Sequence, residues 1–166
     1  MTRTLSLALL ALALMGAAPT AVRAELPGDA EALAEVSDGR LLWDVQEAKA
    51  LRLSNWLTVI LDTYEGLKRN GVRPHMVLVF RGKAVRLLAR DLSDVPFDEV
   101  GMIEEVHSKL DELRRLPRVR LEACNLALRR QGMADRPLVA GVKRVTNAFI
   151  AVAGYGAQGY TRVPVD

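Results

Sequence analysis

The sequence predicts an α/β protein in which a mainly parallel sheet of about five strands lies between layers of helices. Two observations support this class. Short apolar segments with strand character alternate along the chain with amphipathic segments of helical period. One of them, Met76–Phe80, is apolar at every position, which is typical of a strand covered on both faces of a parallel sheet. Alternation at this spacing predicts βαβ units with right-handed crossovers.

Residues 1–24 predict a cleavable export signal. Arg3 is followed by an almost uninterrupted apolar run, Leu5–Met15, and then by small residues that end in Val22-Arg23-Ala24. We favour cleavage after Ala24 over a second small-residue site that ends at Ala18. The alternative is an uncleaved membrane anchor, but the apolar run has only 11 residues and is too short to span a bilayer. We therefore expect a periplasmic or secreted protein.

Removal of those 24 residues leaves 142, which is enough for one domain with a substantial core. The removed segment contains Arg3 and Arg23 and no acidic residue, so the net charge falls from +3 to +1. The basic pI of the whole chain therefore does not indicate a nucleic-acid partner, and we expect none. We also expect no membrane association after cleavage.

The mature chain begins with a solvated arm at residues 25–38. The segment Glu25–Gly39 has five acidic residues and no basic one, and one or two helical turns are expected near Ala30–Glu35. Residues 39–166 then form the single α/β domain.

The first half of the domain contains the clearest helix. Its apolar residues recur at three- and four-residue steps from Leu53 to Leu67, and Asn70-Gly71 ends it. Around it we expect strands at Leu41–Val45 and Met76–Phe80, followed by a short helix over Lys83–Ala89.

The second half continues the alternation. Apolar residues from Phe97 to Leu113 predict another helix, closed by Pro117. After it we expect strands at Val119–Ala123, Val142–Val145 and Tyr160–Val163, with helices over Asn125–Arg130 and from Ala148 to about Ala153, the latter capped by Thr146 or Asn147.

The segment Gly154–Gly159 matches G-x-G-x-x-G, but we reject it as a dinucleotide site. It follows a helix rather than a strand, and only seven residues remain after it. We expect these glycines to break the last helix and turn the chain into the final strand. The sequence also contains no P-loop, nucleophile elbow or H-E-x-x-H motif, so we predict no cofactor.

Cys124 is the only cysteine and cannot form a disulfide within its own chain. It is predicted at the carboxyl end of the third strand, where ligands of open α/β sheets bind. Because the helix Asn125–Arg130 begins there, its free N–H groups would favour a thiolate, and equally a persulfide. The alternative is a small apolar residue that fills space between strand and helix.

The third strand also carries charge on the cysteine face. Strict alternation places Arg120, Glu122 and Cys124 together on one face of the sheet. Arg120 and Glu122 would pair at a subunit interface or lie on a poorly covered face, but a solvated charge pair is the simpler interpretation.

The two histidines do not indicate a metal site. His75 starts the second strand, and His107 has only Glu104 nearby at i, i+3, whereas zinc needs three or four ligands. His75 and Cys124 would also lie at opposite ends of parallel strands.

Three segments together resemble the DsrE/DsrF family of sulfur-relay proteins. They are the strand that ends in Phe80-Arg81-Gly82 with Ala84–Leu88 after it, the segment Leu121–Gly132 around Cys124, and Gly141–Val145 followed by a helix and Gly159-Tyr160. The resemblance covers most of Gly39–Val163 in the family's order and spacing.

The resemblance implies a flavodoxin-like three-layer fold and a homo-oligomer, a trimer or a hexamer of two trimers. It also implies that Cys124 accepts and passes on persulfide sulfur. Where the family's second strand often ends in His-Gly, this chain has Arg81-Gly82, a fixed cation that would suit an anion such as thiosulfate. Export is a second departure, because the characterised relay proteins act in the cytoplasm.

Two functions follow as hypotheses. In the first, the protein is an exported, sulfurtransferase-like carrier of sulfane sulfur on Cys124, with Arg81, Gly82, Asn125 and Asn147 binding a small sulfur-containing anion or meeting a relay partner. In the second, it is a non-catalytic oligomeric module that binds a small ligand or a partner protein, and Cys124 is structural.

Overall fold

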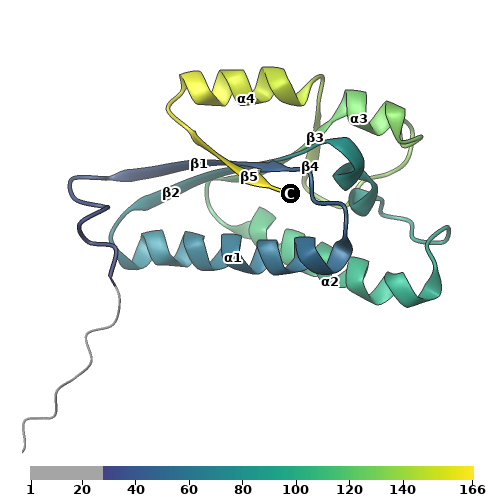
Figure 1. Ribbon diagram of the computed structural model, residues 1–166, viewed down its shortest axis with the longest axis horizontal. Coiled ribbons are helices and arrows are strands. Elements are labelled where there is room, and N and C mark those ends of the chain that lie inside the picture. The colour runs from purple at the N-terminus through teal and green to yellow at the C-terminus, as the bar shows by residue number, and fades with distance from the viewer. Residues whose placement is uncertain (1–27) are drawn as a thin grey trace, which may run out of the picture.

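The computed structural model describes residues 28–166 and forms three layers (Figure 1). A central sheet separates helices α1 and α2 on one face from α3 and α4 on the other. This confirms the predicted α/β three-layer class. The predicted signal peptide and the first residues of the acidic arm lie outside the described residues.

The elements follow the predicted alternation closely. The strands are β1 (Asp38–Val45), β2 (Arg73–Phe80), β3 (Val119–Cys124), β4 (Val142–Val145) and β5 (Thr161–Val165). The helices are α1 (Ala50–Arg69), the 3-10 helix η1 (Gly82–Leu88), α2 (Phe97–Arg115), α3 (Asn125–Arg130) and α4 (Ala148–Ala157). Within the described residues, no helix is both long and apolar enough to cross a membrane.

All five strands are parallel, in the order β4-β3-β2-β1-β5. Strands β1 to β4 add successively in one direction, and the chain then returns over the other face of the sheet through α4 to place β5 beside β1. Every strand therefore ends at the same edge, which collects the residues that follow β1, β2, β3 and β4.

The main core lies between the sheet and the α1–α2 layer. Strand β2 is the central strand, and Met76–Phe80 is fully buried, as its uniform apolar sequence predicts. Helix α1 presents Leu53, Leu57, Ile60 and Tyr64 to this core at three- and four-residue steps.

The opposite face is covered more thinly. Helix α4 carries no charged residue, yet only Ala148 is fully buried, while Phe149 and Ile150 are 65% and 66% exposed. The expectation that the Gly154–Gly159 glycines break this helix is wrong for Gly154 and Gly156, which lie inside α4. Only Gly159, with φ of +83°, makes the turn that needs glycine.

Candidate functional site

Cys124 ends β3 and immediately precedes α3, as predicted. Its side chain is 5% exposed and points towards the α4 layer, where Sγ accepts a hydrogen bond from the backbone N–H of Ala148 at 3.3 Å. Ala148 is the first residue of α4. The observed donor to the sulfur thus comes from α4, whereas the sequence indicated the amides of the helix that follows Cys124.

The sulfur lies against a cavity of about 280 Å³ at the carboxyl edge of the sheet. Three segments build it: the turn from β2 into η1, one face of α3 and the start of α4. The lining residues are Arg81, Gly82, Lys83, Cys124, Leu126, Ala127, Arg130, Gln131, Asn147, Ala148 and Phe149. Within this described lining there are three cationic side chains and no acidic one.

Arg81 lines the cavity with its charge already paired. Its guanidinium donates two hydrogen bonds to Asp44, Nε to Oδ1 at 2.5 Å and Nη2 to Oδ2 at 2.9 Å, and a third to Gln46 Oε1 at 2.7 Å. The ring of Phe149 lies 5.1 Å from the guanidinium carbon. The hydrogen bonds to Asp44 raise the pKa of Arg81 further above its ordinary value.

Asp44 is almost fully buried at the end of β1, yet it stays ionised. Burial raises the pKa of its carboxyl group, but the hydrogen bonds and charges of Arg81 and Arg162 outweigh burial and hold the pKa below 3.8. Arg162 donates from β5 to Asp44 Oδ2, with Nε at 2.7 Å. A single carboxylate thus ties together the carboxyl end of β1, the residue after β2, and β5.

The remaining predicted residues divide into two groups. Gly82, with φ of +60°, turns the chain from β2 into η1 and lines the cavity. Asn147 also lines it and caps α4, because its Oδ1 accepts the N–H of Phe149 at 3.0 Å. Asn125 is partly buried in the first turn of α3 and does not line the cavity.

Lys83 and Arg130 are charged residues of the cavity that the sequence did not indicate. Both are exposed, and neither pairs with a carboxylate within residues 28–166. The helical period could have indicated Arg130, because Ala127, Arg130 and Gln131 share one face of α3. Lys83 could not be assigned this way, because its direction depends on the left-handed turn at Gly82.

Glu122 corrects the expectation of a solvated charge pair on β3. It is only 7% exposed, and its Oε1 accepts a hydrogen bond from the hydroxyl of Tyr155 on α4 at 2.6 Å. Arg120 is exposed. Glu122 is thus buried in contact with Tyr155, whereas Arg120 on the same face of β3 is exposed.

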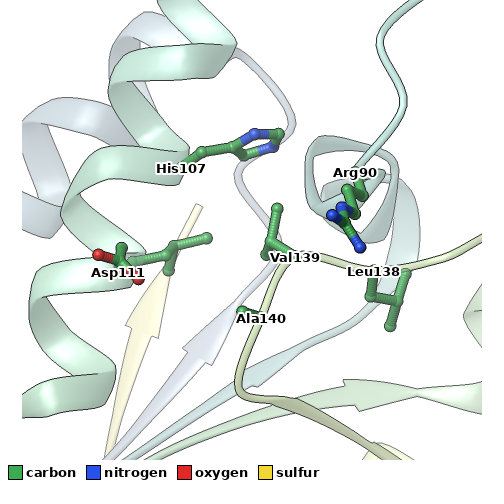
Figure 2. Close-up of a pocket in the computed structure, with 7 residues that line it drawn as sticks. Arg90, His107, Asp111, Leu138, Val139 and Ala140 are labelled. Atoms are coloured by element: carbon green, nitrogen blue, oxygen red, sulfur yellow. The ribbon is translucent and has the colours of Figure 1, made fainter.

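A separate cavity of about 350 Å³ lies on the α2 side of the sheet (Figure 2). His107 points from α2 towards Arg90 and Val139, and Asp111 also lines the cavity. His107 Nε2 donates to the Leu87 carbonyl oxygen at 2.9 Å, and burial lowers the pKa of the ring, which favours its neutral form. Asp111 is paired with Arg114 and Arg115.

The histidines therefore have structural contacts. At the opposite end of the sheet from Cys124, His75 Nε2 lies 3.0 Å from Asp38 Oδ1. Among residues 28–166 no group of three or more His, Cys, Asp or Glu side chains is placed to hold a metal ion.

Fold and site together define a five-stranded parallel α/β protein with one cysteine at the carboxyl edge of its sheet. Among solved structures it is similar to MTH1491 of Methanobacterium thermoautotrophicum, a protein of unknown function, with a TM-score of 0.61 and 20% identity over 76% of this chain and 99% of that one. It is also similar to the ychN protein of E. coli, with a TM-score of 0.51 and 16% identity over 78% and 97% of the two chains. Both structures belong to the DsrE/TusD-like fold family, so this chain has that fold.

Sequence comparison is less informative. No family model matches the chain. An uncharacterized protein of Aquifex aeolicus (strain VF5) is 27% identical over 108 residues, which are 65% of this chain. The match spans about half, 48%, of the length of that relative.

The buried network predicts acid-sensitive stability. Because the pKa of Asp44 is lower in the folded chain than in the unfolded one, folding favours its ionised form. This contribution is complete well above pH 3.8 and is lost as the pH falls through the folded pKa. Urea unfolding at pH 3 to 7 should therefore show a steep acid loss in the wild type and a weaker pH dependence in Asp44→Asn.

At pH 7 the Asp44→Asn variant should also be less stable by about 3 kcal/mol, because Arg81 and Arg162 lose their shared partner. Asp98→Asn, at an exposed position on α2, is the control. Equal acid dependence in wild type and Asp44→Asn would show that the carboxylate does not hold this edge together.

Proposed function

We propose that the protein is an exported carrier of sulfane sulfur that acts through Cys124. The observation that supports this most directly is the position of Sγ, which accepts the Ala148 N–H beside a cavity that contains only cationic charged side chains. A thiolate and a persulfide are both anions, and both are stabilised by such surroundings. Assembly into a homo-oligomer belongs to this proposal, and the exposed Phe149 and Ile150 on α4 support it.

The transfer step we propose uses thiosulfate as the model donor. The Cys124 thiolate attacks the outer sulfur of thiosulfate, a new S–S bond forms, and the original S–S bond breaks with its electron pair leaving on sulfite. Cys124 then carries a persulfide anion, and no external oxidant or reductant is needed. Attack on the terminal sulfur by an acceptor thiolate returns Cys124 to its starting state.

The cations of the cavity have different parts in this proposal. Arg81 is committed to Asp44 and Gln46, so it shapes the wall of the cavity. Lys83 and Arg130 carry charge that no carboxylate of the described residues compensates. They are the side chains suited to attract a dianionic donor and to hold the sulfite that leaves.

Loading of Cys124 is the direct test. Incubation of the reduced protein with thiosulfate or polysulfide should raise its intact mass by one sulfur atom, and Cys124→Ser should gain nothing. Dithiothreitol should reverse the gain, and cyanide should release the sulfur as thiocyanate. Both reversals are needed because oxidation to a sulfinic acid adds two oxygens of nearly the same mass but resists thiols.

A structural cysteine would give a different result. If Cys124 reacts with iodoacetamide only after denaturation and never gains sulfur, the carrier function is excluded and the binding-module function takes its place.

Charge removal at the cavity should slow loading. Lys83→Gln and Arg130→Gln should each reduce the rate with thiosulfate, and together by roughly tenfold at low salt, with less effect at high salt. Alkylation by the neutral reagent iodoacetamide should stay unchanged. Lys143→Gln, an exposed lysine on β4, is the matched control. Equal thiosulfate rates in all variants would contradict the assigned roles.

Export is tested separately. Expressed in a bacterial host, the full chain should yield a periplasmic product of 142 residues that begins at Glu25, as read by intact mass and N-terminal sequencing. Replacement of Leu9 and Leu10 by Arg should retain the uncleaved chain in the cytoplasm. If the wild-type chain is recovered uncleaved from the cytoplasm, export is contradicted, and the proposed sulfur chemistry of Cys124 is not affected.

A further inference from the structure

A second hollow lies between α4 and the outer strand β4, and it shares Asn147 with the Cys124 cavity. Its volume is about 510 Å³, within the range of small-molecule sites. The lining residues are Glu122, Arg144, Val145, Thr146, Asn147, Ile150, Ala151, Gly154, Tyr155 and Gln158. The sulfur chemistry proposed above uses none of them except Asn147.

Glu122 is the feature of this hollow that structure alone does not explain. Its Oε1 is satisfied by the Tyr155 hydroxyl, but Oε2 is fully buried and has no hydrogen-bond partner within residues 28–166. A buried carboxylate oxygen without a donor is costly, and such groups are rare in folded proteins. The position therefore fits a donor that residues 28–166 do not supply.

The neighbouring cations do not fill this role. Arg144 lines the hollow, but its guanidinium donates to the carbonyl oxygens of Ala134 and Arg136 at 2.7 and 2.8 Å. Lys143, the register partner of Glu122 on β4, is exposed. Arg120 interacts with the Tyr155 hydroxyl, on the Oε1 side of the carboxylate.

Tyr155 keeps its proton and so remains a donor. Burial and the hydrogen bond to Glu122 raise the pKa of the phenol above 10.0, although Arg120 opposes this. Oε1 thus stays occupied across the physiological range of pH, and Oε2 is the buried acceptor that is left without a donor.

We propose that this hollow binds a small organic cation, an alkylammonium or alkylguanidinium, whose N–H groups donate to Glu122 Oε2. The apolar part of the ligand packs against Val145, Ile150 and Ala151, which form the apolar wall. Thr146 and Gln158 at the rim offer oxygen acceptors for further N–H groups. The site does not depend on Cys124 carrying sulfur.

The test uses the full chain and three probes: butylguanidinium, butylammonium and neutral 1-butanol, followed by calorimetry and amide NMR. The two cations should bind and shift the amides of residues 144–155, and butanol should bind far more weakly. Glu122→Gln keeps an oxygen for Tyr155 but removes the charge, so it should weaken cation binding by at least about tenfold. Glu99→Gln, an exposed acid on α2, should bind as the wild type does.

A second variant tests the site without touching the carboxylate. Gly154 lines the hollow and a Cβ there would meet no atom within 4 Å, so Gly154→Leu is expected to place a side chain in the hollow. It should reduce cation binding to a similar extent. Cys124→Ser should bind the cations normally, which separates this site from the sulfur proposal.

Three results would overturn the proposal. They are absence of cation binding to the folded wild type, equal affinity in wild type and Glu122→Gln, and sedimentation data in which Glu122→Gln dissociates an oligomer. In the last case the donor to Oε2 would be a side chain of a second copy, and the hollow would be a subunit interface.

Discussion

The buried carboxylate of Asp44 organises the edge of the sheet at which the candidate site lies. It receives hydrogen bonds from Arg81, which follows β2, and from Arg162 on β5, so one acidic side chain fixes three segments that are distant in sequence. Such a pair is favourable only because nearly all of its hydrogen-bonding capacity is used. Because Asp44 compensates the charge of Arg81, this arginine lines the Cys124 cavity without offering an unpaired positive charge to a ligand.

The two faces of the sheet differ in a way that places the chemistry. The face towards α1 and α2 is a conventional apolar core. The face towards α4 carries three ionisable side chains, Asp44, Glu122 and Cys124. All three are buried on the side of the sheet covered by α4, which has no charged residue. Each accepts hydrogen bonds from a different kind of donor. Asp44 accepts them from arginines, one oxygen of Glu122 from a tyrosine hydroxyl, and the sulfur of Cys124 from a backbone N–H.

Asn147 lies where the two hollows of this face meet. It caps α4, and the residue after it donates to the sulfur, so the start of this helix determines both the sulfur environment and one wall of the Glu122 hollow. A ligand or a second copy bound at α4 would therefore act on the residue that borders Cys124.

Apolar periodicity and chain alternation are local properties, so the sequence is enough to predict the parallel α/β layering, the bounds of most elements and the position of Cys124 at the end of β3. It could not determine which charges meet. The sequence predicts that Arg81 is an available cation and that Glu122 belongs to a solvated charge pair. The structure differs because their partners, Asp44 and Tyr155, are 37 and 33 residues away in the sequence. Which side chains are neutralised and which remain able to act depends on the long-range contacts that bring the strand ends and α4 together.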